Sequence, residues 1–139
     1  MEKPNKHAIS VIIRNQKGET LFARRSSHKK TFPLVWSLPS YFVNDDEKPE
    51  DTIARIGTHK LGVKLKAIRL LIEGYGERPG FRLFMHDYEA EIESGEPRIA
   101  SDDFIELKWA KAEAFLPTIQ TKGECTRLYG EYLEKLKDY

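Results

Sequence analysis

The sequence has little cysteine, almost no net charge and no long hydrophobic run. Cys125 is the single cysteine in 139 residues, which excludes an internal disulfide and a zinc site built from several cysteines. Lysine plus arginine number 23 and aspartate plus glutamate 22. The net charge is therefore too small to attract nucleic acid or an anionic membrane to the protein as a whole. No apolar stretch could span a bilayer, and the first residues are polar. These absences predict a soluble, cytoplasmic protein with a reduced thiol and no membrane partner.

The length of the chain predicts a single domain over residues 1–139 with one sizeable core. A turn at residues 15–18 predicts a hairpin between two short apolar strands. In chain order, strands are expected at 7–14, 20–24, 66–74, 81–92 and 104–109, and helices at 49–61, 111–116 and 121–137. This order of elements predicts an α/β (α+β) sandwich. The apolar stripe of the last helix, which includes Cys125, is expected to pack in the core.

The helix expected at 49–61 has a clear beginning and end. Proline and acidic residues open it, and Gly62 follows it, as is typical of helix termini. Ile56, His59 and Lys60 are three and four residues apart and are expected to share one face. Mg²⁺ requires hard oxygen ligands. Since this face offers an apolar side chain, an imidazole and an ammonium group, we expect no divalent cation there.

The residues around this helix resemble the metal-binding box of the Nudix (MutT-like) hydrolase superfamily. Glu47, Arg55, Gly62 and Val63 lie at the family's spacing, and the segments at 36–39 and 104–109 resemble its flanking strands. The resemblance covers residues 7–116 and implies a Nudix-like α/β/α sandwich with a mixed sheet. In this degenerate box, Tyr41 replaces the opening glycine, and Ile56, His59 and Lys60 replace three glutamates. Glu47, Arg55 and Gly62 are expected to be structural, while Glu47 and His59 are the remaining candidate metal ligands.

Residues 24–36 also resemble the segment that leads to the active site in the isopentenyl diphosphate isomerase branch of this superfamily. Arg24, Arg25, Lys29 and Lys30 lie in this segment. Guanidinium and ammonium groups suit a diphosphate, although a solvated loop is an equally good interpretation. The isomerase activity itself is not expected, because Tyr41 and Val43 stand where that branch has its nucleophilic cysteine and a metal-binding histidine.

Two functions remain open at this point. The first is a module that binds a phosphorylated small molecule, such as a nucleotide or, with less support, RNA. Its expected ligand-binding residues are Arg24, Arg25, Lys29, Lys30, Lys60 and Tyr41, with Phe42 or Tyr75 available for stacking. The second is a divergent hydrolase that uses Mg²⁺ or Mn²⁺ and the carboxylates of Asp102, Asp103 and Glu50. No cofactor is certain. The oligomeric state is open, and if a homodimer forms, the C-terminal helix is a candidate contact, although its packing on its own domain comes first.

Overall fold

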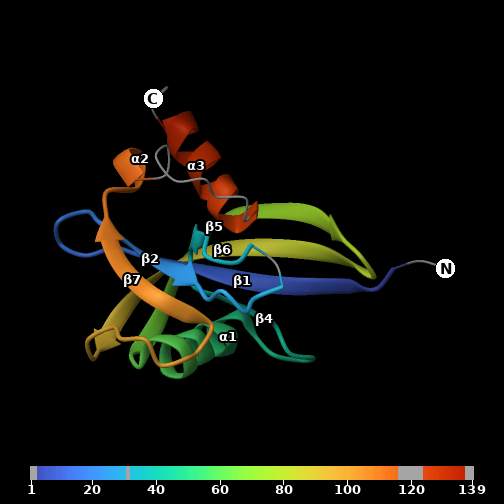
Figure 1. Ribbon diagram of the computed structural model, residues 1–139, viewed down its shortest axis with the longest axis horizontal. Coiled ribbons are helices and arrows are strands. Elements are labelled where there is room, and N and C mark those ends of the chain that lie inside the picture. Colours follow the sequence, from blue (N-terminus) through green and yellow to red (C-terminus); the bar gives the residue numbers. More distant parts are fainter. Residues whose placement is uncertain (1–2, 31, 116–123, 137–139) are drawn as a thin grey trace.

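The computed structural model describes residues 3–30, 32–115 and 124–136 (Figure 1). The strands are β1 (Asn5–Ile13), β2 (Thr20–Arg25), β3 (Trp36–Ser37), β4 (Ser40–Phe42), β5 (Lys64–Arg78), β6 (Phe81–Ser94) and β7 (Phe104–Ala110). The helices are α1 (Pro49–Arg55), the π-helical η1 (Ile56–Leu61), α2 (Ala112–Phe115) and α3 (Glu124–Leu136). No helix in this described part of the chain is long and apolar enough to cross a bilayer.

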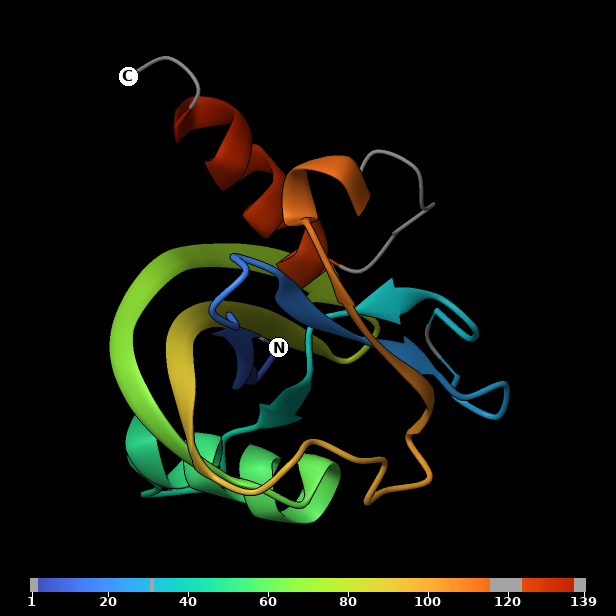
Figure 2. The same ribbon diagram turned by 90° about the vertical axis from the view of Figure 1, so that its left-hand side faces the viewer.

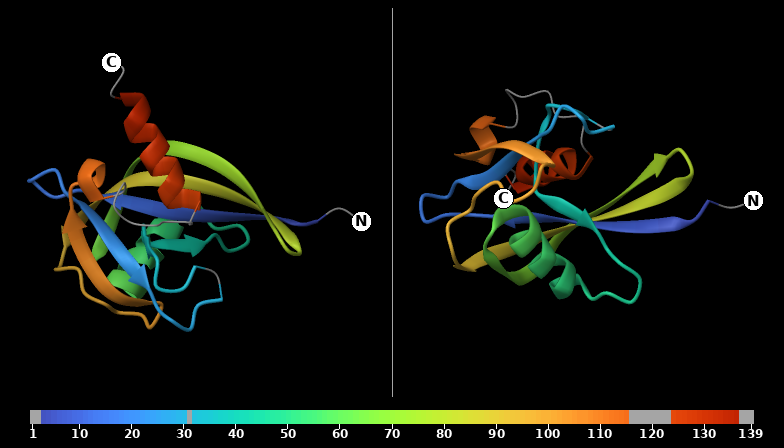
Figure 3. Two further views of the ribbon diagram at one scale, coloured as in Figure 1. Left: turned by 45° about the horizontal axis from the view of Figure 1, so that its top comes forward. Right: turned by 60° about the horizontal axis from the view of Figure 1, so that its bottom comes forward.

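The strands form two sheets. The larger sheet has the order β4-β1-β6-β5, with β1 parallel to β6 and the other two pairs antiparallel. The smaller sheet has the order β3-β2-β7 and is antiparallel. The long strands β5 and β6 curve strongly (Figure 2), and they extend beside β1 toward the N-terminal end (Figure 3). The prediction of an α/β fold with a mixed sheet is confirmed.

Helices lie on both sides of the larger sheet, with α1 and η1 on one side and α3 on the other (Figure 1). Successive residues of a strand point to opposite faces of its sheet, so β1 contributes buried side chains to the core on both faces of the larger sheet. Ile9 and Val11 pack with Ile53 of α1 in the main cluster. Ile12 packs on the opposite side in a second cluster with Tyr129 of α3. The hydroxyl of Tyr129 is also hydrogen-bonded to Thr20 Oγ1 at 3.0 Å.

The apolar stripe predicted for the last helix is visible in part. Tyr129 is fully buried, and Tyr132 and Leu133 are partly buried against the same cluster. The side chain of Cys125 lies outside the described part of the chain, as does the expected start of the helix at 121–123. Tyr129, Tyr132 and Leu133 therefore pack this face of α3 against the rest of its own domain.

The helix predicted over 49–61 is a short α-helix that continues as the π-helical segment η1. It ends at Gly62, which has a left-handed conformation with φ of 66°. The three residues that were expected to share one face differ in exposure: Ile56 is completely buried in the main core cluster, Lys60 is 7% exposed and His59 is exposed.

Gly57 of η1 lies in close contact with residues 63 and 65 at the start of β5. A Cβ atom at this position would lie 2.7 Å from the carbonyl oxygen of Val63 and 2.9 Å from Cγ of Leu65. Glycine therefore allows the start of β5 to approach η1 closely, although it is unfavourable inside a helix.

Candidate functional site

The loop before α1 is held by an ion pair. Arg55 donates to both carboxylate oxygens of Glu47 at 2.7 and 2.8 Å, and it also donates to the carbonyl of Phe42 at 2.9 Å. Glu47 further accepts hydrogen bonds from the Thr52 hydroxyl and the Asn44 backbone. The hydrogen bonds from Arg55, then from Asn44 and Thr52, lower the pKa of Glu47 to about 2. Because both of its carboxylate oxygens accept these hydrogen bonds, Glu47 fixes the loop to the helix.

Lys60 occupies the centre of the site. Only 7% of the residue is exposed, and its Nζ lies 2.5 Å from Oδ2 of Asp103. The other oxygen of Asp103 accepts from Lys29 at 2.9 Å. The ammonium of Lys60 also lies 4.3 Å from the ring centre of Tyr41, and the guanidinium of Arg55 lies at the same distance from that ring. Asp103 thus connects two lysines that come from different parts of the chain.

The segment before β7 places Asp103 beside Lys60. The backbone amide of Arg98 donates to the carbonyl of Leu61 at 2.9 Å, and that of Ala100 donates to the carbonyl of Lys60 at 3.1 Å. These bonds satisfy carbonyl groups at the end of η1, where no further helical turn can do so. The segment is therefore attached to the end of η1, and β7 begins immediately after Asp103.

Burial and charge act in opposite directions at this site. Burial raises the pKa of Asp103, but the hydrogen bonds from Lys60 and Lys29 outweigh it and hold the pKa well below its usual range. Burial lowers the pKa of Lys60, and the nearby cations Lys29 and Arg25 lower it further, while Asp103 opposes them. Burial also lowers the pKa of Arg25. The site therefore concentrates positive charge that one carboxylate balances only in part.

A pocket of about 730 Å³ opens beside these residues. Its lining combines Ala8 and Ser10 of β1 with Tyr41 of β4 and Lys60 of η1. Six of its lining residues are lysine or arginine and only one is acidic: Lys6, Arg25, Lys29, Lys30, Lys60, Arg78 and Asp103. The apolar part of the lining includes Phe42, Phe81, Leu83 and Met85. A pocket of this size and composition can hold a small anionic molecule.

Most of the ligand-binding residues expected from the sequence come together here. Arg25, Lys29, Lys30, Tyr41 and Lys60 all line the pocket. Arg24 does not line it; its guanidinium binds Glu106 at 2.8 Å and the Leu34 carbonyl at 3.1 Å.

The other expected residues are more dispersed. Glu50 lies exposed in the first turn of α1, away from the pocket lining. His59 is exposed, with its ring against the edge of Tyr41. Of the two stacking candidates, Phe42 lines the pocket, whereas Tyr75 lies against Phe84 on β6.

Comparison with known proteins agrees with the fold. The family model of the NUDIX domain matches residues 4–129. The chain belongs to the Nudix family. Among solved structures, a MutT protein from Methanosarcina mazei superposes with a TM-score of 0.81 at 23% identity, covering 99% of this chain and 96% of that one. A MutT Nudix hydrolase from Burkholderia pseudomallei also has a TM-score of 0.81, at 25% identity, covering 94% and 99%.

Curated Nudix relatives match over shorter parts of their own length. An isopentenyl-diphosphate Delta-isomerase from Corynebacterium diphtheriae is 36% identical over 63 residues, which are 45% of this chain and 34% of the isomerase. An NAD-capped RNA hydrolase from Mannheimia succiniciproducens is 29% identical over 133 residues, covering 93% of this chain and 48% of that protein. This chain thus spans about a third to a half of these relatives.

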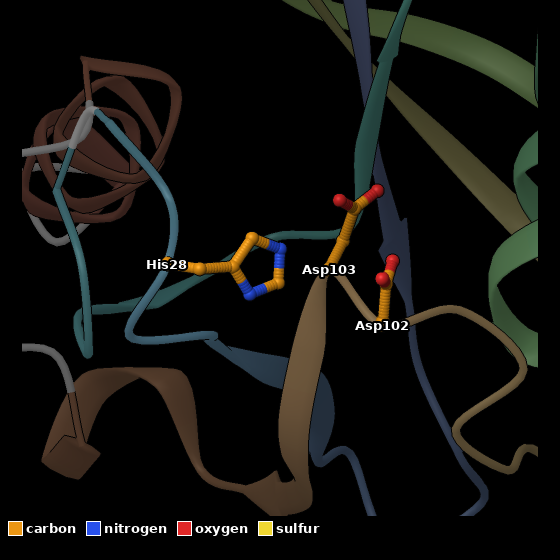
Figure 4. A group of neighbouring side chains, drawn as sticks. All are labelled: His28, Asp102 and Asp103. Atoms are coloured by element: carbon orange, nitrogen blue, oxygen red, sulfur yellow. The ribbon is translucent and has the colours of Figure 1, made fainter.

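Nudix hydrolases generally use Mg²⁺ or Mn²⁺, which raises the question of whether the side chains of this site could bind a divalent cation. Within the described residues, His28, Asp102 and Asp103 form the one group of three potential ligands, with ligand atoms within 4.8 Å of one another (Figure 4). Both oxygens of Asp103 are already bound to ammonium groups. At the box itself, Ile56 is in the core and Lys60 is a cation. These residues do not fit the hard, anionic oxygen site that such a cation requires.

Sequence reasoning missed several residues of the pocket. Lys6, Ser10 and Arg78 line it, together with the apolar residues Leu83 and Met85. Lys6 and Ser10 of β1 lie beside Leu83 and Met85 because β1 pairs with β6 in a parallel arrangement, whereas Arg78 is the last residue of β5. No local pattern in the sequence indicates that pairing, so nothing in the sequence could have placed these residues together.

Proposed function

We propose that this Nudix protein binds a phosphorylated small molecule, such as a nucleotide, through cationic side chains and without a divalent cation. The observation that carries this proposal is the charge of the pocket, where six lysine or arginine residues face a single aspartate. Phosphate oxygens are neutralised well by guanidinium and ammonium groups, which act in place of a metal. Lys60 is the central residue because it stands at a position where the family's box has a carboxylate.

The geometry explains how such a ligand would bind. Lys29 and Lys60 both direct their ammonium groups to Asp103, from different segments of the chain. A phosphate that approaches them can take over these contacts, since its oxygens are comparable acceptors with more negative charge. Arg25 and Lys30 lie in the same lining and can bind further oxygens of a diphosphate. Tyr41 keeps Lys60 in place through its ring.

The test is calorimetric titration of the protein with pyrophosphate in the presence of a chelator. Wild-type protein is expected to bind without metal, and Lys60→Ala to weaken the affinity at least about tenfold, as expected for a lost charge-assisted hydrogen bond. Lys64→Ala is the matched control, because Lys64 has a side chain that is 70% exposed on β5 and lies outside the pocket lining. The proposal fails if binding requires Mg²⁺, or if the two variants behave alike.

The alternative is a divergent hydrolase that cleaves a nucleoside diphosphate-linked substrate with Mg²⁺ or Mn²⁺. The names of the relatives favour it, since they include RNA pyrophosphohydrolases from Pseudomonas. Its metal ligands would be His28, Asp102 and Asp103, and Asp103 would first have to lose its two ammonium partners. Turnover of nucleoside triphosphates, dinucleoside polyphosphates or ADP-ribose that depends on metal, and that Asp102→Asn or Asp103→Asn abolishes, would establish this alternative in place of the binding function. RNA is a further candidate ligand that the same titration can test.

A further inference from the structure

Two histidines form a hydrogen-bonded pair on the larger sheet, outside the pocket. Nδ1 of His7 lies 2.9 Å from Nε2 of His86, and Nδ1 of His86 lies 2.7 Å from a carboxylate oxygen of Glu73. The three residues come from the neighbouring strands β1, β6 and β5, and all three lie outside the pocket lining. His7 is two residues before Ile9 and so shares its face of the sheet, the one that packs against α1.

Glu73 determines which nitrogen of each ring carries a proton. A carboxylate only accepts, so Nδ1 of His86 donates to it, and Nε2 of the neutral ring presents a lone pair. The hydrogen-bond network then assigns the proton between the two rings to Nδ1 of His7. A carboxylate on the far nitrogen is the usual support of a metal-binding histidine, because it orients the ring and makes the other nitrogen more basic. His86 therefore has the surroundings of a metal ligand.

The spacing of the two nitrogens suits one shared ion. Imidazole nitrogens bind Zn²⁺ and similar ions at about 2.0–2.1 Å, so two of them at a right angle around one ion are about 2.9 Å apart. The observed separation is 2.9 Å. The ring of His7 lies beside that of Phe84, with ring centres 5.2 Å apart, but the residue is exposed, and the side chain of His86 is 21% exposed. An ion with its water molecules can therefore reach both rings.

Carboxylates from two elements lie near the pair. Glu73 on β5 contacts His86 directly. Tyr88 follows His86 on the same face of β6, and burial raises its pKa, which the negative charges of Glu73 and Glu50 raise further. Glu50 of α1 therefore acts on the same strand as Glu73. Negative charge from both elements favours a cation at this place.

We propose that His7 and His86 bind one late first-row transition-metal ion, such as Ni²⁺ or Cu²⁺, and that Glu73 positions His86 for it. Two nitrogens at a right angle fit the square-planar or tetragonal coordination that these ions prefer, whereas Mg²⁺ prefers hard oxygen ligands. The ion replaces the proton between the rings, and that proton moves to Nε2 of His7, so both imidazoles stay neutral. The bound ion connects β1 to β6 where these strands extend toward the N-terminal end (Figure 3).

The experiment is calorimetric titration of metal-free protein, without a histidine tag, with Ni²⁺ and with Mg²⁺. We expect wild-type protein to bind one Ni²⁺ and no Mg²⁺ at this site. His7→Gln and His86→Gln should each weaken Ni²⁺ at least about tenfold, because a single imidazole remains. His28→Gln is the matched control, since His28 belongs to the other group of potential ligands, and it should bind Ni²⁺ as wild-type protein does.

Two further measurements test the roles of the individual groups. The electron paramagnetic resonance spectrum of bound Cu²⁺ should show coupling to two imidazole nitrogens in wild-type protein and to one in His7→Gln. Glu73→Ala should weaken Ni²⁺ roughly tenfold, and Glu73→Gln, which keeps an acceptor for Nδ1 of His86, should restore part of the affinity. Melting temperatures of the metal-free variants show that each one is folded.

The outcomes either support this inference or overturn it. Loss of Ni²⁺ binding in His28→Gln, with His7→Gln unaffected, would assign the ion to the group of His28, Asp102 and Asp103 and overturn the proposal. Absence of binding of Ni²⁺ and Cu²⁺ by wild-type protein would also overturn it and leave the hydrogen bond between the rings a structural one. An unchanged affinity in Glu73→Ala would overturn the positioning role. His7→Gln should bind pyrophosphate as wild-type protein does, so this inference and the proposed function stand or fall separately.

Discussion

Replacing Asp103 with asparagine separates the two proposed functions by the direction of the effect. Asp103 is the one acidic residue in the lining and accepts from Lys29 at 2.9 Å and from Lys60 at 2.5 Å. A phosphate that contacts the same two ammonium groups would lie about 5 Å from this carboxylate. Two unit charges at that separation repel by roughly 1–3 kcal/mol, between the values for water and for a protein surface. Asp103→Asn is therefore expected to bind pyrophosphate about tenfold more tightly.

The same substitution should destabilise the unliganded protein. Lys60 is only 7% exposed, so the loss of its counter-ion leaves a nearly buried ammonium group without its neutralising charge. We expect a cost of about 2–3 kcal/mol, below that of a completely buried pair, and a melting temperature lower by roughly 5–10 °C.

Calorimetry with pyrophosphate and thermal unfolding measure the two effects on the same samples. Asp102→Asn is the matched control, because it changes the adjacent, exposed carboxylate, and it should alter stability by less than about 0.5 kcal/mol. Weaker pyrophosphate binding by Asp103→Asn, or loss of a metal-dependent turnover, would refute the role of Asp103 as a competitor of the ligand. Unchanged stability would show that Lys60 does not depend on this partner.

Three further predictions concern the scaffold. The pKa of Glu47 is about 2 in the folded protein, against an ordinary value of 4.5. The ionised carboxylate therefore stabilises the protein above pH 4.5, and this contribution is lost as the pH falls toward 2. Melting temperatures measured at about pH 2–6 should show this loss in wild-type protein and not in Glu47→Gln. Gly57→Ala should lower the free energy of unfolding by roughly 1–2 kcal/mol, because the new methyl group would clash with Val63 and Leu65 by more than alanine gains in helix propensity. Denaturant unfolding measures this change, and a stabilised variant would contradict the close contact. Tyr129→Phe should cost about 1–2 kcal/mol by the same assay, since Thr20 loses its buried partner, and no change would show that this bond is not formed.

The sequence predicted those features that depend on residues near one another in the chain. Glu47 and Arg55 are eight residues apart, on a loop and the helix that follows it, so their pairing could be inferred from the family's spacing. Gly62 ends the helical segment because a left-handed conformation suits glycine, which is a local property. The alternation of strands and helices likewise gave the fold class.

Contacts between distant segments could not be predicted in the same way. Lys60 and Asp103 are 43 residues apart, and they meet only because the segment before β7 is hydrogen-bonded to the end of η1. The position of Ser10 depends on the register between β1 and β6, which no short pattern specifies. The burial of Ile56 depends on the packing of η1 against the larger sheet, which the sequence of the helix alone does not specify.

The structure also explains how the Nudix fold can be kept while the charge of its box is changed. The loop before α1 depends on the pair Glu47–Arg55, and the end of η1 depends on Gly62 and the backbone of residues 98 and 100. All of these contacts are made between groups of the protein itself. Lys60 can therefore take the place of a carboxylate without loss of the fold, provided that its own charge is balanced. Asp103 supplies this balance, and because it lies at the pocket wall, the proposed phosphate ligand would compete with it for the same ammonium groups.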